Sequence, residues 1–215
     1  MPNANFLDLQ PDSKKKIYQD MLAISGSLTR LFSDSNVPYL VYRSVENAFC
    51  EAFGAENLSR SDSAVDAVKN GIGIGIKTFL NANGYTSQKI AEFNRDSSQF
   101  NHISNPKELV RVVSQLRNAR LDLAKRTYNL HTLVYHCVVR DPYSIMVYET
   151  PMDPIDIQSI KGVSFNANQN VVVFSDSKHQ YRFNISKSTL YRHFRTENIL
   201  LDIPVRILDN PFSVL

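Results

Sequence analysis

The sequence has no long apolar run and no cysteine framework. No segment approaches the roughly 18 consecutive apolar residues of a membrane-spanning helix, and residues 1–16 lack the apolar core of a signal peptide. The two cysteines, Cys50 and Cys137, lie in separate apolar runs and form no CxxC pair, which argues against a zinc site or a disulfide framework. We therefore expect a cytoplasmic protein with buried thiols and no membrane partner.

The sequence also carries little excess charge of either sign. The net charge is +3 and the pI is about 8.8, so the overall charge permits a polyanionic partner without requiring one. Basic residues are concentrated in residues 111–126 and 178–195, and acidic residues thin out in the second stretch. Either stretch could be a nucleic-acid surface or simply a solvated face, which is the usual role of a charge run.

The apolar share of 43% and charged share of 21% over 215 residues are typical of a globular protein. We predict a core over residues 1–150 and a β-rich portion over residues 151–215, which could belong to the same domain. The apolar end, residues 210–215, is either a terminal strand that docks on the fold or the cut edge of a longer protein with further domains.

Periodicity predicts a mixed α/β (α+β) fold. Apolar residues at helical spacing indicate helices over residues 12–32, 42–53 and 106–128. Strand-like runs joined by Asn70-Gly71 and by Asp141-Pro142 indicate two hairpins, over residues 63–79 and 130–149. Further strands are expected at residues 163–165, 170–174 and 180–185, followed by a helix over residues 186–194 that Ser186 would cap.

The first hairpin carries the most informative pattern. Side chains alternate along a strand, so the three isoleucines of residues 72–76 share one face, while Gly73, Gly75 and Lys77 share the other. Glycines at alternate positions are typical of a strand that a ligand or another backbone approaches closely. Asp66, on the first strand of the hairpin, can reach the same edge as Lys77, so an acid and an amine are expected to converge.

This segment resembles the PD-(D/E)xK nuclease superfamily, whose members include type II restriction endonucleases. The resemblance covers residues 40–80 and implies a restriction-endonuclease-like core, in which a mixed central sheet is flanked by helices. It also implies that carboxylates bind Mg²⁺, that the metal lowers the pKa of the attacking water, and that Lys77 orients this water and stabilises charge on the phosphate.

The sequence departs from the family pattern at Gly75, where the acid two residues before Lys77 is expected. The resemblance therefore implies a second carboxylate from elsewhere, and Glu46 on the preceding helix is the candidate, with Asp62 in reserve. Each residue also has a simpler interpretation. Glu46 could be a solvated helical residue, and Asp66 and Lys77 could be edge-strand charges that block aggregation.

Basic, hydroxyl and aromatic residues alternate in residues 176–195, a composition that suits nucleic acid. The N-terminus of the predicted helix would bind phosphate together with nearby side chains, and the polar face of the preceding strand would reach base edges. The predicted DNA-binding residues are Lys178, Gln180, Arg182, Asn184, Ser186, Lys187, Ser188 and Arg192. A surface strand with Tyr181, Phe183 and Ile185 in the core is the alternative.

The function predicted from these patterns is a Mg²⁺-dependent, sequence-specific endonuclease acting on double-stranded DNA. Glu46, Asp66 and Lys77 would be catalytic, and Glu46, Asp66 and Asp62 would bind the metal. A homodimer would suit cleavage of two antiparallel strands. The alternatives are a DNA-binding or specificity module without chemistry, which Gly75 favours, and a nuclease of repair or of RNA.

His131 and His136 are expected to lie on opposite faces of a strand and to be poor co-ligands.

Overall fold

The computed structural model describes residues 5–214, which divide into two compact units. The first unit comprises Met1–Gly84, Ala124–Met152 and Thr196–Leu215, and the second comprises Tyr85–Leu123 and Asp153–Arg195. This division differs from the predicted boundary near residue 150. The chain enters the second unit at Tyr85, and its last residues return to the first, because strands distant in sequence pair within each unit.

A six-stranded mixed sheet forms the first unit, in the order β1-β2-β3-β5-β6-β11. Strands β3 and β5 are parallel, and the other neighbours are antiparallel. The strands are β1 (Glu56–Asn57), β2 (Ala67–Lys69), β3 (Ile72–Leu80), β5 (Thr132–Asp141), β6 (Ser144–Pro151) and β11 (Leu201–Pro204).

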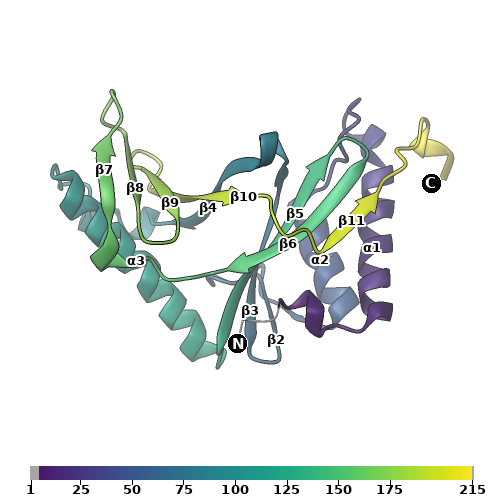
Figure 1. Ribbon diagram of the computed structural model, residues 1–215, viewed down its shortest axis with the longest axis horizontal. Helices are drawn as coiled ribbons and strands as arrows, with labels where there is room; N and C mark the ends of the chain where they lie inside the picture. The colour runs from purple at the N-terminus through teal and green to yellow at the C-terminus, as the bar shows by residue number, and fades with distance from the viewer. Residues whose placement is uncertain (1–4, 215) are drawn as a thin grey trace. The chain divides into compact units, whose positions relative to one another are not determined.

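Helices α1 (Asp12–Ser27) and α2 (Tyr42–Phe53) pack on one face of this sheet (Figure 1). The core between them includes Tyr18 and Phe49 from the helices and Ile74 from β3. The amphipathic helix predicted over residues 42–53 is confirmed to the residue, and it ends at Gly54, whose φ of 63° supplies the left-handed C-cap. The predicted isoleucine face is therefore the core face.

The Asn70-Gly71 hairpin is also confirmed. Both residues have positive φ, 48° and 73°, as a two-residue turn between twisted antiparallel strands requires. Strand β2 is shorter than expected, because the regular ladder with β3 ends at the pair Ala67 and Ile74. Asp66 lies just beyond this last pair.

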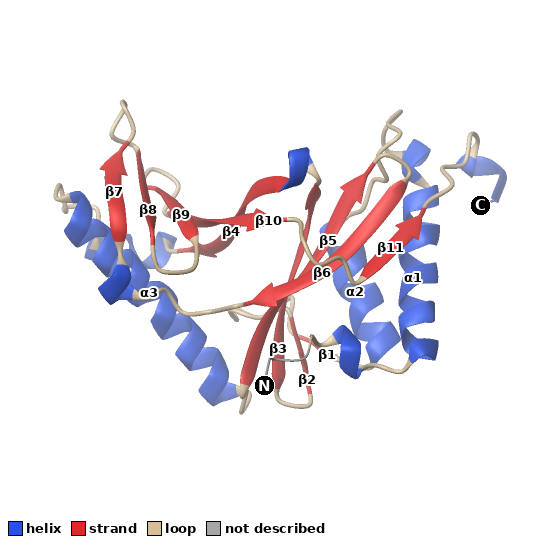
Figure 2. Cartoon of the chain, in the orientation of Figure 1, coloured by secondary structure: helices blue, strands red, loops and turns tan. Residues whose placement is uncertain are grey.

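A five-stranded antiparallel sheet forms the second unit, in the order β4-β10-β9-β8-β7 (Figure 2). The strands are β4 (Tyr85–Glu92), β7 (Lys161–Phe165), β8 (Val171–Ser175), β9 (Gln180–Asn184) and β10 (Thr189–Arg195). Helix α3 (Pro106–Thr127) packs its apolar side, including Leu109 and Val113, against one face of this sheet. The predicted core residues Tyr181 and Phe183 lie in this interface.

The helix predicted over residues 186–194 is wrong, because this segment is the turn after β9 followed by strand β10. The Asn184 carboxamide oxygen accepts from the backbone N–H of Lys187 (2.9 Å), and Ser188 takes a left-handed φ of 47°. The burial of Leu190, Arg192 and Phe194 then has a period of two rather than 3.6.

The remaining elements are short 3₁₀ helices. They are η1 (Leu7–Leu9), η2 (Thr29–Leu31), η3 (Ala82–Gly84), η4 (Asn94–Gln99), η5 (Ile157–Ser159) and η6 (Pro211–Val214). The last of these occupies the place of a possible terminal strand, and Leu215 lies outside the described residues. The predicted α+β class is confirmed, and none of the helices within residues 5–214 is long and apolar enough to cross a membrane.

Candidate functional site

Asp66 is fixed at the end of the β2–β3 ladder by its backbone and by its side chain. Its N–H donates to the carbonyl of Ile74 (2.8 Å), and its carbonyl accepts from the N–H of Leu58 (2.9 Å). Its carboxylate Oδ2 accepts from the N–H of Ile76 (2.7 Å). The side chain thus takes the place of a strand partner for β3, so the carboxylate is held one residue before Lys77.

Glu46 is brought to the same region by helix α2. Its side chain is 7% exposed, although it lies on a helix with a solvent face. The guanidinium of Arg43 donates to the Glu46 carboxylate (3.0 Å) and to the carbonyl of Ser59 (2.9 Å), which anchors the loop that follows β1. The interpretation of Glu46 as a solvated residue is therefore wrong.

The pKa of Glu46 depends on its burial and on the charged groups around it. Burial raises its pKa above the ordinary range of a glutamate, and the negative charge of Asp66 raises it further. The positive charges of Arg43 and Lys77 and a hydrogen bond with Ser59 act in the opposite direction. Asp66 and Lys77 are thus among the charged groups that act on the Glu46 carboxylate.

The ammonium group of Lys77 lies over the ring of Tyr135, with Nζ 5.8 Å from the ring centroid. Tyr135 lies on β5 directly across from Gly75, so its ring covers the strand just before Lys77. A cation above an aromatic face is attracted by the ring quadrupole. Tyr135 therefore restrains the half-buried Lys77 side chain.

The sequence suggested that the alternating glycines of β3 admit a ligand or another backbone, but Gly73 and Gly75 make room for the protein's own side chains. A Cβ atom on Gly75 would lie 2.4 Å from Cε of Met152 and 3.0 Å from the ring of Tyr135. At Gly73, a Cβ atom would lie 2.7 Å from methyl carbons of both Leu130 and Leu133. A side chain at position 75 would have to displace the end of Met152 and would crowd the Tyr135 ring.

The third predicted metal ligand, Asp62, is exposed on the loop between β1 and β2. Within residues 5–214, no three His, Cys, Asp or Glu side chains form a group that could hold a metal ion. The donors that remain are the carboxylates of Glu46 and Asp66. This set fits Mg²⁺, which in proteins is commonly bound by one or two carboxylates together with water and substrate phosphate.

Cys50 lies one helical turn after Glu46 and is buried. Burial raises the pKa of its thiol to about 11, and the charges of Glu46 and Asp66 contribute to this rise. A thiol with this pKa is protonated at neutral pH and is a poor nucleophile. The chemistry of the cluster formed by Glu46, Asp66 and Lys77 (the Glu46 cluster) is therefore that of carboxylates and an amine.

The predicted DNA-binding residues fall into several environments in the second unit. Gln180 is exposed on β9, whereas Arg192 is 5% exposed on the face of β10 that packs inward. Lys178 pairs with Asp153 (3.2 Å). The Asn184 carboxamide oxygen accepts from the Ser186 hydroxyl (3.0 Å) and from the N–H of Lys187 (2.9 Å), and the N–H of Ser188 donates to the carbonyl of Ile185 (3.0 Å). Because no helix begins at Ser186, the predicted phosphate site at a helix N-terminus is also wrong.

A buried polar network in the first unit was missed by the sequence analysis. The hydroxyl of Tyr18 is 3.0 Å from Nε2 of His136, and Nδ1 of His136 is 2.8 Å from the carboxylate of Glu149. Burial and the charge of Glu149 hold the pKa of Tyr18 well above its usual range. The register of the β5–β6 hairpin, which places His136 opposite Glu149, is the signal that could have found this pair.

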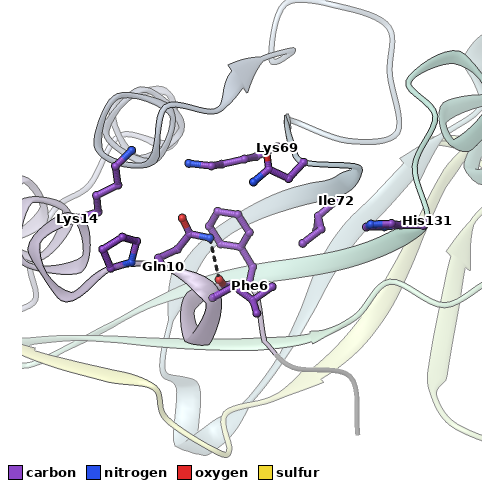
Figure 3. A pocket seen from close by; sticks show the side chains of 9 residues that line it. Phe6, Gln10, Lys14, Lys69, Ile72 and His131 are labelled. Atoms are coloured by element: carbon purple, nitrogen blue, oxygen red, sulfur yellow. Dashed lines mark hydrogen bonds between the residues drawn. The ribbon is translucent and has the colours of Figure 1, made fainter. Parts of the chain in front are cut away.

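A separate hollow of about 380 Å³ lies beside the Asn70-Gly71 turn (Figure 3). Its polar lining includes Gln10, His131 and two lysines, Lys14 and Lys69, whose ammonium groups both donate to the carbonyl of Phe53. These lysines provide hydrogen-bond donors for a carbonyl in the last turn of α2, where the helix dipole favours positive charge. The hollow does not contain Glu46, Asp66 or Lys77.

Comparisons of this chain with protein-family models, with curated proteins and with solved structures gave no match.

Proposed function

We propose that this protein is a Mg²⁺-dependent endonuclease that hydrolyses phosphodiester bonds of double-stranded DNA at specific sequences. The observation that supports it best is the buried carboxylate of Glu46, whose pKa responds to both Asp66 and Lys77. A buried acid with a perturbed pKa beside a second acid and an amine is typical of a catalytic site. The resemblance of residues 40–80 to restriction-type nucleases is the reason for proposing DNA as the substrate.

In this proposal, Glu46 and Asp66 hold Mg²⁺ and Lys77 positions the attacking water. Bound Mg²⁺ would polarise the scissile phosphate and lower the pKa of water. Lys77 places a positive charge where negative charge develops on the phosphate, and the Tyr135 ring restrains it there. The bond between Asp66 and the N–H of Ile76 fixes one carboxylate relative to Lys77, which limits the reorganisation needed during the reaction.

Cleavage of both strands would be served by a homodimer, because two symmetry-related sites address two antiparallel strands. Light scattering of the protein in the presence of a cognate duplex would reveal this state as a doubling of mass. A stable monomer that cuts both strands would exclude it.

The main test is cleavage of plasmid DNA with Mg²⁺ by the wild type, Glu46→Gln, Asp66→Asn and Lys77→Met. We expect each variant to lose activity by about 100-fold or more, because each removes a charged group that acts at the reacting phosphate. Glu51→Gln is the matched control, since Glu51 is exposed on the same helix and undergoes the same acid-to-amide change. A second readout is a rise in melting temperature with Mg²⁺, which Glu46→Gln should abolish.

A DNA-binding module without chemistry is the second candidate, and Gly75 with its filled surroundings is the observation in its favour. DNA binding by the wild type without any cutting, unchanged by Lys77→Met, would support this candidate and contradict the nuclease. Cutting of RNA in preference to duplex DNA would retain the chemistry and change the substrate.

A further inference from the structure

The face of the five-stranded sheet opposite α3 carries a second set of basic, aromatic and polar side chains. Helix α3 covers the face that contains Phe183 and Leu190. Strand alternation therefore places the neighbouring residues of β4, β9 and β10 on the other face. We call this set the outward face, and it consists of Tyr85, Ser87, Lys89, Gln180, Arg182, Asn184, Tyr191, His193 and Arg195.

The register aligns these residues into rows across the three strands. Tyr191 lies between Arg182 on β9 and Lys89 on β4, and Arg195 lies across from Tyr85. His193, which is exposed, lies between these rows on β10 and across from Ser87. The rows bring guanidinium, phenol and imidazole groups next to one another across the three strands.

Two guanidinium groups on this surface are held by aromatic rings. The guanidinium carbon of Arg182 is 4.4 Å from the centroid of the Tyr191 ring, and that of Arg195 is 5.5 Å from the centroid of the Tyr85 ring. Stacking on a ring restricts an arginine side chain while its N–H donors stay directed outward.

The charge of the outward face is positive. None of its residues is an Asp or Glu, and the nearby Glu92, at the end of β4, is paired with Lys89 (2.9 Å). A surface that carries two arginines stacked on aromatic rings and no Asp or Glu of its own complements a polyanion.

We infer that the outward face is a recognition surface for duplex DNA, which it binds without Mg²⁺. Arg182, Arg195 and Gln180 carry the donors that read guanine and adenine edges in the major groove, while the exposed His193 suits phosphate oxygens. This inference rests on the proposed function only in the choice of duplex DNA among polyanions.

The arrangement of the rings favours a duplex over single-stranded nucleic acid. Proteins that bind single strands stack unpaired bases on open aromatic rings. Here each ring has one face taken by a guanidinium, and Tyr191 is itself half-buried. The groups presented outward are therefore hydrogen-bond donors, which suit base edges and phosphates of a duplex.

The test is fluorescence anisotropy with a mixed-sequence 30-base-pair duplex in EDTA, over a range of salt concentrations. We expect Arg182→Ala/Arg195→Ala to weaken binding by about tenfold or more and to flatten the dependence of affinity on salt. The matched control is Lys107→Ala/Arg111→Ala, which removes the same charge from exposed positions on α3. This control should change binding by less than about threefold.

Equal binding by the wild type and Arg182→Ala/Arg195→Ala would overturn the inference, and so would equal weakening by both double variants. Tighter binding of a single-stranded or RNA probe would also overturn it. Plasmid cleavage with Mg²⁺ separates the proposed function from this inference, because binding measured in EDTA requires neither the metal nor the chemistry of the Glu46 cluster. A wild type that binds through the outward face and cuts nothing would support the recognition surface while contradicting the nuclease.

Discussion

The Glu46 cluster and the outward face differ in how their polar side chains are brought together and in how exposed these side chains are. The cluster is assembled from helix α2, the residue before β2 and strand β3, and the Glu46 residue is buried. The outward face consists of alternating positions on three adjacent strands, and its residues include the exposed His193 and Arg195.

This difference has a consequence for ionisation. Burial and a neighbouring charge shift the pKa of Glu46, so the enclosed cluster suits chemistry that depends on protonation or on a metal. Arginines on an exposed sheet keep their charge and stay accessible, which suits recognition of a partner. We therefore expect substitutions of buried polar residues in the first unit to lower stability strongly. Substitutions on the outward face should affect mainly the binding of a partner.

The largest effect on stability is expected from His136→Ala. This change leaves the buried carboxylate of Glu149 without its imidazole partner, at a cost of about 3–5 kcal/mol. Thermal unfolding should show a fall in melting temperature of about 10 °C. The matched change on the open face, His193→Ala, should alter stability by less than about 0.5 kcal/mol, and equal losses in the two variants would break the comparison.

Gly73→Ala should destabilise the protein by about 1–3 kcal/mol, because its Cβ would press on two leucines of a packed core. Gly75→Ala should cost less, since its closest neighbour is the end of the flexible Met152 side chain. Urea denaturation measures both. If Gly75→Ala proved the more damaging, packing by Met152 and Tyr135 would be tighter than that around Gly73.

Glu46→Gln should raise the melting temperature at neutral pH in EDTA. The pKa of Glu46 is raised in the folded state, so the folded protein binds this proton more tightly than the unfolded chain does. Wild-type stability is therefore lost as pH rises from the ordinary glutamate range through the raised pKa, and a glutamine does not titrate. The gain should appear above this window and disappear below pH 4, whereas a gain at every pH would contradict the mechanism.

The smallest effect on stability is expected on the outward face. Arg182→Ala and Arg195→Ala should each change the free energy of unfolding by no more than about 1 kcal/mol, the value of an exposed cation–π contact. Their loss of DNA affinity should occur without a matching loss of fold, which circular dichroism and thermal melts would verify. A marked destabilisation would mean that these arginines support the sheet.

Local patterns were sufficient for most of the secondary structure. The bounds of α2, the Asn70-Gly71 turn and helix α3 followed from amphipathic spacing, from turn chemistry and from a Gly54 stop signal. Strand β4 and the return of the C-terminal residues to the first unit were not predicted. These features depend on pairing between distant strands, which short-range periodicity does not encode.

The candidate site was predicted in part. Asp66 and Lys77 share one hairpin, so their proximity follows from register, and Glu46 was chosen because a helix before the hairpin can project an acid onto it. The sequence could not reveal that Met152 and Tyr135 fill the space beside Gly75, or that Arg43 holds the Glu46 carboxylate. Such contacts join residues far apart in the chain or depend on rotamers that only packing selects.

The sequence by itself determined helices α2 and α3, the Asn70-Gly71 hairpin and which side chains share a face of β3, because these features depend on neighbours within a few residues. Tertiary structure alone decided the environment of each polar group. It buried Glu46 beside Asp66, enclosed His136 between Tyr18 and Glu149, and stacked Arg182 on Tyr191. Burial and charge proximity act through space, so the chemistry of these groups is set only when distant elements pack together.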